Sequence, residues 1–128
     1  MAVTPSWSHE ALWACNPRNI ANARDFVAGH LVDHDLARMV EDAALVVSEL
    51  ATNAVVHART PFEVTLSRYD GTVEIAVTDG LWTAPPFVQT HLFELGGRGL
   101  TLVEGYSRSW GVRPTSDGGK SVWAALSL

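Results

Sequence analysis

The sequence predicts one α+β domain, a two-layer sandwich in which helices pack on one face of a mixed, mainly antiparallel sheet. The first half of the chain carries two stretches with the apolar spacing of helices, and two hairpin signals follow in the second half. The chain has 128 residues, well below the roughly 250 residues at which hydrophobic cores divide. We therefore expect a single domain over residues 1–128.

Composition argues against several classes of function. Nine Lys and Arg against fourteen Asp and Glu give a net charge of −5 and a pI near 5.4, so the basic surface typical of direct nucleic-acid binding is missing. A single cysteine excludes an internal disulfide and a zinc site built on several thiolates. The chain shows no signal-peptide pattern and no apolar run of the roughly 18 residues that a membrane span needs. We expect a cytoplasmic protein with no direct contact with nucleic acid or membrane.

The N-terminal half predicts a strand followed by two helices. Trp7 to Ala14 reads as a short edge strand, and Asn16-Pro17 then provides a helix cap and a proline at the first helical position. The apolar face of this first helix runs from Ile20 to Leu31. A second cap at Asp33-His34-Asp35 precedes a longer helix from Leu36 to about Ala58, a stretch without glycine or proline.

Two histidines near the end of the first helix invite a metal-site interpretation. His30 and His34 are four residues apart and are flanked by Asp33 and Asp35. The helix is expected to break at this point, and no Glu stands beside the first histidine. We therefore expect these residues to lie in a solvated loop between the two helices.

The longer helix carries polar side chains that need a role. Ten of the fifteen residues from Ala43 to His57 are Ala, Val or Leu, so this helix must be largely buried. The five exceptions are Ser48, Glu49, Thr52, Asn53 and His57. At about 100° per residue, Glu49, Asn53 and His57 lie within one quarter of the helix circumference. An unpaired buried polar group costs about 1–3 kcal/mol, so they need partners, either other side chains or a ligand with its metal.

The second half predicts two hairpins separated by a long loop. Apolar and polar residues alternate from Phe62 to Ser67 and from Val73 to Thr78, and Asp70-Gly71 between them signals a tight turn. Residues 81–96 show no sustained period and contain Pro85-Pro86, so this loop is too long for a simple connector. The chain then closes with a short helix and a second hairpin, expected over Leu100–Tyr106, Trp110–Val112 and Ser121–Leu126.

Two glycine-containing segments of the second half suit a ligand, although each also has a purely structural interpretation. Asp79-Gly80 follows a strand, where the carboxylate can accept a hydrogen bond from a ligand amino group or cap a turn. Gly97-Arg98-Gly99 precedes a helix, where backbone amides can contact phosphate oxygens or the glycines can form a hinge. The order of these segments along the chain is more informative than either one.

That order resembles the GHKL ATPase superfamily and, within it, the small anti-sigma factor serine/threonine kinases. The resemblance covers nearly the whole chain, and its most specific parts are ELATNAVVHA and GRGLTLVEGYSRSWGVRP. It implies the Bergerat ATP-binding fold and a bacterial regulatory kinase that uses ATP and Mg²⁺. Such a kinase transfers a phosphoryl group to a small antagonist protein, the anti-sigma factor antagonist, and sequesters a sigma factor. The resemblance also implies a homodimer.

The resemblance assigns roles to individual residues. It implies that Glu49 is the general base for the acceptor hydroxyl and that Asn53 binds the Mg²⁺ that bridges the ATP phosphates. Asp79 would accept a hydrogen bond from the adenine amino group, supported by the hydroxyl of Ser121. Arg98 would neutralise charge on the transferred phosphoryl group. The remaining residues expected to bind the nucleotide are Gly80, Gly97, Gly99 and Leu100.

Two departures from the family pattern favour an alternative. The family box Asp-x-Gly-x-Gly is replaced by Asp79-Gly80-Leu81-Trp82-Thr83, which lacks both later glycines. The segment expected to cover the phosphates is short and contains prolines, and its Arg98 lies between two glycines. The alternative is a degenerate, non-catalytic interaction module that regulates transcription without ATP turnover.

Overall fold

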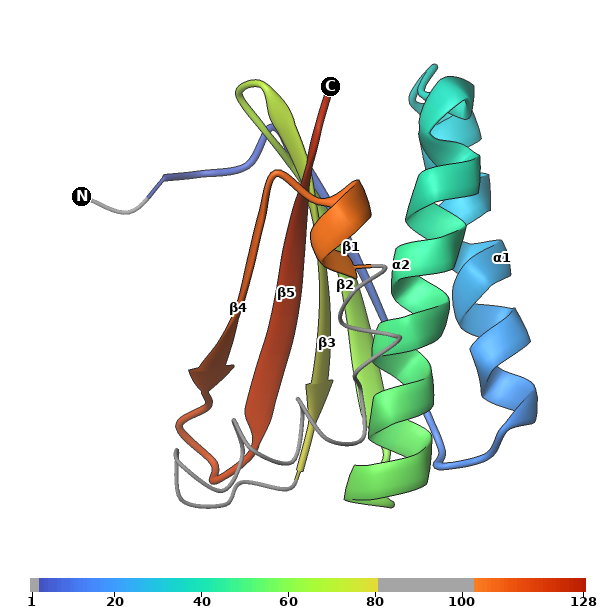
Figure 1. Ribbon diagram of the computed structural model, residues 1–128, viewed down its shortest axis with the longest axis vertical. Coiled ribbons are helices and arrows are strands. Elements are labelled where there is room, and N and C mark those ends of the chain that lie inside the picture. The colour runs from blue at the N-terminus through green and yellow to red at the C-terminus, as the bar shows by residue number, and fades with distance from the viewer. Residues whose placement is uncertain (1–2, 81–102) are drawn as a thin grey trace.

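The computed structural model describes residues 3–80 and 103–128, which form a five-stranded sheet with two long helices on one face (Figure 1). The strands are β1 (Trp7–Trp13), β2 (Phe62–Tyr69), β3 (Thr72–Asp79), β4 (Ser109–Pro114) and β5 (Lys120–Ser127). Their order is β1-β2-β3-β5-β4, and each neighbouring pair is antiparallel. The expected α+β sandwich is confirmed, with a sheet that is antiparallel rather than mixed throughout the described residues.

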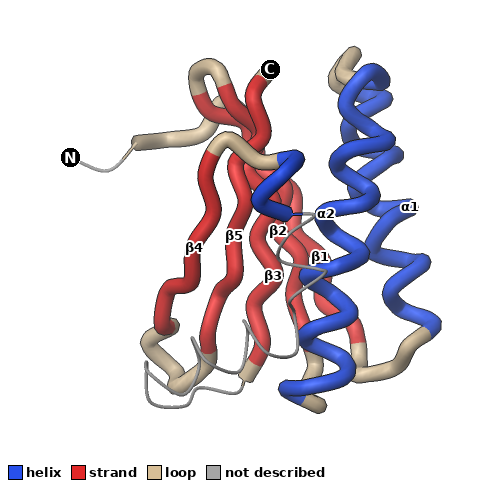
Figure 2. Tube along the Cα trace, viewed as in Figure 1, coloured by secondary structure: helices blue, strands red, loops and turns tan. Residues whose placement is uncertain are grey.

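The helical layer has four consecutive segments. These are α1 (Arg18–Asp33), the 3₁₀ turn η1 (Ala37–Met39), α2 (Val40–Asn53) and the π turn η2 (Ala54–Ala58). Figure 2 shows both long helices on the same side of the sheet, and no described helix covers the other side. A further helical turn spans residues 103–106, while the expected loop over 81–96 and the start of the helix expected at 100 lie outside the described residues.

The long helix expected from Leu36 to about Ala58 has about the expected length, but it is not a regular α-helix throughout. It begins as a 3₁₀ turn, continues as α2 and ends in the π turn η2. Two of its polar side chains bond back to the same helix: Ser48 Oγ donates to the Ala44 carbonyl at 2.7 Å, and Thr52 Oγ1 donates to the Ser48 carbonyl at 2.6 Å. These bonds give Ser48 and Thr52 structural roles.

The hydrophobic core lies between the helices and the sheet. Helix α1 buries Ala23, Val27 and Leu31, the face that the sequence predicts, and continues past Gly29 to its end at Asp33. The other fully or nearly fully buried side chains include Val46, Val47 and Leu50 of α2, Phe62, Val64 and Leu66 of β2, and Val73, Ile75 and Val77 of β3. Alternate residues of β2 and β3 are therefore buried in the core, as the period of two predicts.

The expectation of a solvated loop was wrong for His30, which lies in α1, and right for His34 only in its position, since His34 lies in the turn between the helices but is half-buried. His30 lies in the last turn of α1 and His34 caps that helix, and both pack against β1. The Trp7 and His34 rings stack with their centroids 3.9 Å apart, as do the His9 and His30 rings at 3.8 Å. His9 Nε2 and His34 Nε2 share a hydrogen bond of 2.9 Å. Helical spacing alone could not place these rings, because their partners come from a strand distant in sequence.

This cluster makes folding stability depend on pH. Burial and the nearby His30 and His34 lower the pKa of His9 below its ordinary value of 6.5, while Asp33 acts in the opposite direction. The unfolded chain therefore takes up the His9 proton at a higher pH than the folded chain. The stability that His9 contributes is present above about pH 6.5 and is lost as the pH falls from there to its lower folded pKa.

We expect the urea midpoint of unfolding to fall between about pH 7.5 and pH 5.5, and to fall less in His9→Gln, which does not titrate there. Urea titrations followed by tryptophan fluorescence at several pH values measure both midpoints. An equal fall in the wild type and in His9→Gln would contradict the assignment to His9.

Candidate functional site

Several predicted site residues come from elements that terminate at one end of the sandwich. Asn53 is the last residue of α2 and Asp79 the last residue of β3, and both elements reach the lower end of the view in Figure 1. Glu49 lies one helical turn before Asn53 on α2 and is half-buried. The backbone N–H of Gly80 donates to Thr60 Oγ1 at 2.9 Å. This bond ties the end of β3 to the segment that follows the long helix.

Asn53 carries a buried polar atom that nothing in the described structure satisfies. Its side-chain Nδ2 is inaccessible to solvent and has no hydrogen-bond partner within residues 3–80 and 103–128. The π turn η2 begins at the next residue, and π turns inside helices often mark functional sites. A buried unpaired amide costs about 1–3 kcal/mol. It therefore fits a position where a ligand provides the partner.

The same amide has the chemistry that an ATP site needs. Its Oδ1 is a hard oxygen of the kind that Mg²⁺ prefers, and its Nδ2 can donate to an anionic oxygen. Mg²⁺ keeps several waters and phosphate oxygens in its coordination shell, so one protein carboxamide is sufficient. The Asn53 side chain thus fits the expected Mg²⁺ and nucleotide.

Asp79 is paired with a lysine that the sequence interpretation did not assign. Lys120 Nζ donates to Asp79 Oδ2 at 2.8 Å and to Oδ1 at 3.1 Å. The two side chains are only 12% and 3% exposed, Lys120 being the more accessible. Lys120 is also the only lysine in the chain. The carboxylate expected to bind adenine therefore already holds a positively charged donor from its own chain.

The register of β3 against β5 corrects the expected contact between Asp79 and Ser121. Asp79 lies opposite Lys120, while Thr78 lies opposite Ser121. Because side chains alternate along a strand, Asp79 and Lys120 share one face of the sheet, and Thr78 and Ser121 share the other. The supporting neighbour of Asp79 is Lys120 rather than Ser121. A register is set by long-range pairing, so the motif alone could not identify it.

The turn between β4 and β5 holds the start of β5 tightly against the end of β3. A Cβ atom at Gly119 would lie 2.0 Å from the carbonyl oxygen of Asp79, and Gly118 has φ +90°. The N–H of Gly119 donates to Thr115 Oγ1 at 2.9 Å. Only glycine leaves room for this approach. The glycine pair before Lys120 thus places that lysine beside Asp79.

Four expected nucleotide-binding residues lie outside the described residues. They are Gly97, Arg98, Gly99 and Leu100, and their roles stay predictions. The Leu81-Trp82-Thr83 departure from the family box also lies there. His57 is half-buried on η2, and the structural role expected for it stays a prediction.

A comparison with known protein families identifies the domain. A family model described as the histidine kinase-like ATPase domain matches residues 14–126, which include Asn53, Asp79 and Lys120. The chain belongs to this family. The family match supports the GHKL superfamily that the motifs resemble. A comparison with curated proteins gave no match.

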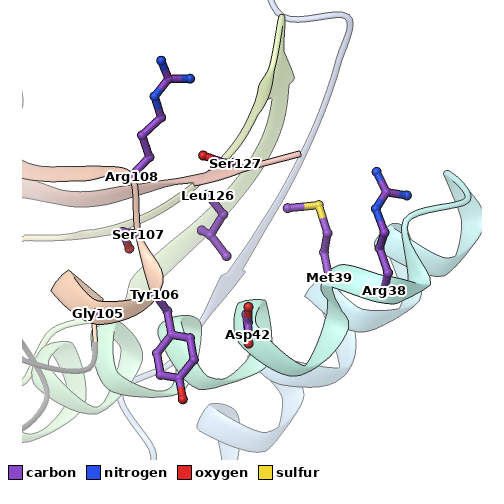
Figure 3. Close-up of a pocket in the computed structure, with 9 residues that line it drawn as sticks. All are labelled: Arg38, Met39, Asp42, Gly105, Tyr106, Ser107, Arg108, Leu126 and Ser127. Carbon is purple, nitrogen blue, oxygen red and sulfur yellow. The ribbon is translucent and has the colours of Figure 1, made fainter.

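Two further observations concern the parts of this histidine kinase-like ATPase domain outside the candidate site. A cavity of about 470 Å³ lies near the start of α2, the opposite end of that helix from Asn53 (Figure 3). Its lining consists of Arg38, Met39, Asp42, Gly105, Tyr106, Ser107, Arg108, Leu126 and Ser127, and includes none of the predicted site residues. Within the described ranges, no helix is long and apolar enough to cross a membrane.

The close approach of Gly119 to Asp79 gives a prediction about stability. Gly119→Ala is expected to lower the free energy of unfolding by about 1–3 kcal/mol, because the new methyl group forces the turn away from Asp79. Gly29→Ala is the matched control: its Cβ would meet nothing within 4 Å, and alanine stabilises a helix interior by about 0.5–1 kcal/mol. Urea unfolding measures both changes. A Gly119→Ala protein as stable as the wild type would refute the packing argument.

Proposed function

We propose that the protein is a regulatory serine/threonine kinase that binds Mg-ATP, phosphorylates a small antagonist protein and acts as an anti-sigma factor. The observation that carries the proposal is the buried, unpaired Asn53 amide at the end of α2, one turn after Glu49, in a histidine kinase-like ATPase domain. The proposed partners are the antagonist and a sigma factor, and the proposed assembly is a cytoplasmic homodimer. The acidic net charge of −5 supports action through proteins rather than DNA.

Asn53 and Glu49 of α2 have different roles in this proposal. Asn53 would hold the Mg²⁺ and nucleotide through its carboxamide, and the Mg²⁺ would supply positive charge to neutralise the phosphates. Glu49, one turn away, accepts the proton of the serine or threonine hydroxyl as the hydroxyl oxygen bonds to the γ-phosphorus of ATP and ADP leaves. A half-buried carboxylate suits this task, because it is shielded from bulk water yet open to a docking substrate.

The ion pair between Lys120 and Asp79 favours a second candidate function. If Lys120 stays on Asp79, the adenine amino group finds its acceptor occupied. The protein would then act as a non-catalytic interaction module with the same fold. A wild-type protein that shows no Mg-dependent ATP binding in calorimetry would favour this module over the kinase.

The kinase proposal predicts different defects for two residues on one helix. Asn53→Ala should weaken Mg-dependent ATP binding at least about tenfold, because it removes a ligand of the metal. Glu49→Gln should bind ATP like the wild type but transfer phosphate about 10²–10⁴-fold more slowly, because it removes the base. Calorimetry measures binding, and transfer of labelled γ-phosphate to a co-purified antagonist measures activity.

Glu41→Gln is the control for these variants. Glu41 is an exposed carboxylate in the first turn of the same helix, so both readouts should match the wild type. Equal ATP affinity in wild type and Asn53→Ala would remove the basis of the proposal. Undiminished transfer by Glu49→Gln would refute the role of Glu49 as general base.

A further inference from the structure

We propose that Lys120 is a specificity-determining residue that competes with adenine for Asp79. In the nucleotide-free protein its ammonium takes the hydrogen-bonding place that the adenine amino group needs. This inference rests on the proposed nucleotide binding, and it adds a residue that controls both affinity and base preference.

The geometry of the pair supports competition rather than sharing. Lys120 Nζ lies within 3.1 Å of both carboxylate oxygens of Asp79, so neither oxygen is without a donor. The Asp79 side chain is only 3% exposed. A ligand therefore reaches the carboxylate only by displacing what covers it. Ammonium and aromatic amine are both N–H donors, and an ionised carboxylate only accepts.

The backbone fixes the position of Lys120 next to Asp79. Asp79 and Lys120 are directly opposite in the β3–β5 register, on the face of the sheet that carries the helices. Gly119, the residue before Lys120, approaches the Asp79 backbone too closely for any side chain. Lys120 therefore starts from a fixed point beside the carboxylate. Only its flexible stem has to move when a ligand enters.

The strengths of the two bonds set the direction of the effect. Both bonds are charge-assisted because the carboxylate is ionised, but only the ammonium also neutralises the buried charge of Asp79. The Lys120 bond is thus preferred when no nucleotide is present. The apparent affinity for adenine equals the intrinsic affinity multiplied by the fraction of molecules in which the carboxylate is available.

The competition has a consequence for the choice of base. Adenine presents an amino group where hypoxanthine presents a carbonyl oxygen. The carbonyl has no proton to donate to Asp79, but it can accept one from Lys120. Lys120 therefore disfavours adenine nucleotides and does not disfavour hypoxanthine nucleotides.

The test compares ADP and inosine diphosphate, each with Mg²⁺, on wild type, Lys120→Met and Lys120→Gln. We expect ADP affinity to rise about tenfold or more in Lys120→Met and by a smaller factor in Lys120→Gln, which keeps a neutral donor. Affinity for inosine diphosphate should stay equal or fall. Arg113→Gln is the matched control: it removes one positive charge from the neighbouring strand β4, where Arg113 pairs with Glu74 and is 54% exposed. It should leave both affinities unchanged.

A second measurement uses the wild-type protein and does not depend on a variant that folds. Because Lys120 is the only lysine, protein labelled with ¹⁵N-lysine contains one side-chain ammonium to follow by NMR. ADP is expected to shift its resonance strongly, as the ammonium leaves Asp79. Inosine diphosphate is expected to shift it less.

The outcomes separate the inference from the proposed function. Equal or lower ADP affinity in the Lys120 variants, or an unmoved ammonium resonance in ADP-saturated protein, overturns the inference and leaves nucleotide binding intact. A parallel gain for ADP and inosine diphosphate also overturns it. Absence of binding by wild type and all variants overturns both. ADP binding that appears only in the Lys120 variants supports the inference.

Discussion

The burial of α2 between α1 and the sheet is the constraint on which the rest of this domain depends. Most of its side chains are apolar, and Val46, Val47 and Leu50 are essentially inaccessible to solvent. The helix packs against both α1 and the central strand β3. Polar groups on such a helix have few hydrogen-bond partners available. The Ser48 and Thr52 hydroxyls donate to backbone carbonyls of the same helix, whereas Glu49 and Asn53 are the residues of α2 to which the proposed function assigns a ligand.

Local periodicity was sufficient to predict most of the fold. A period of two along β2 and β3 identifies the faces that are buried in the core, because alternation is a property of each strand alone. The apolar spacing of α1 identifies Ala23, Val27 and Leu31 in the same way. The π turn η2 is different. It changes the hydrogen bonding of a helix that reads as regular, and the AVVHA sequence carries no signal for it.

The neighbour of Asp79 and the surroundings of His30 and His34 could not be predicted from sequence, because both depend on contacts between distant segments. The role given to Ser121 fell on the wrong face, because a register shift of one residue exchanges the two faces of a strand. His30 and His34 were placed in solvent, although β1 brings Trp7 and His9 against them. By contrast, Asn53 and Asp79 were found from motif resemblance. A motif names such residues, but pairing across the sheet decides what touches them.

Asn53 and Asp79 differ in the state in which the fold leaves them. Asn53 has a buried donor that no described residue satisfies, and a ligand that fills it removes a cost already present in the free protein. Asp79 is satisfied by Lys120, and a ligand that needs this carboxylate has to break an existing bond. In the proposed nucleotide site, the Asn53 end would therefore favour occupancy and the Asp79 end would oppose it. A kinase and a non-catalytic module can share this fold. In the kinase the free energy gained when a ligand satisfies Asn53 exceeds the cost of breaking the bond between Asp79 and Lys120, and in the module the cost is larger.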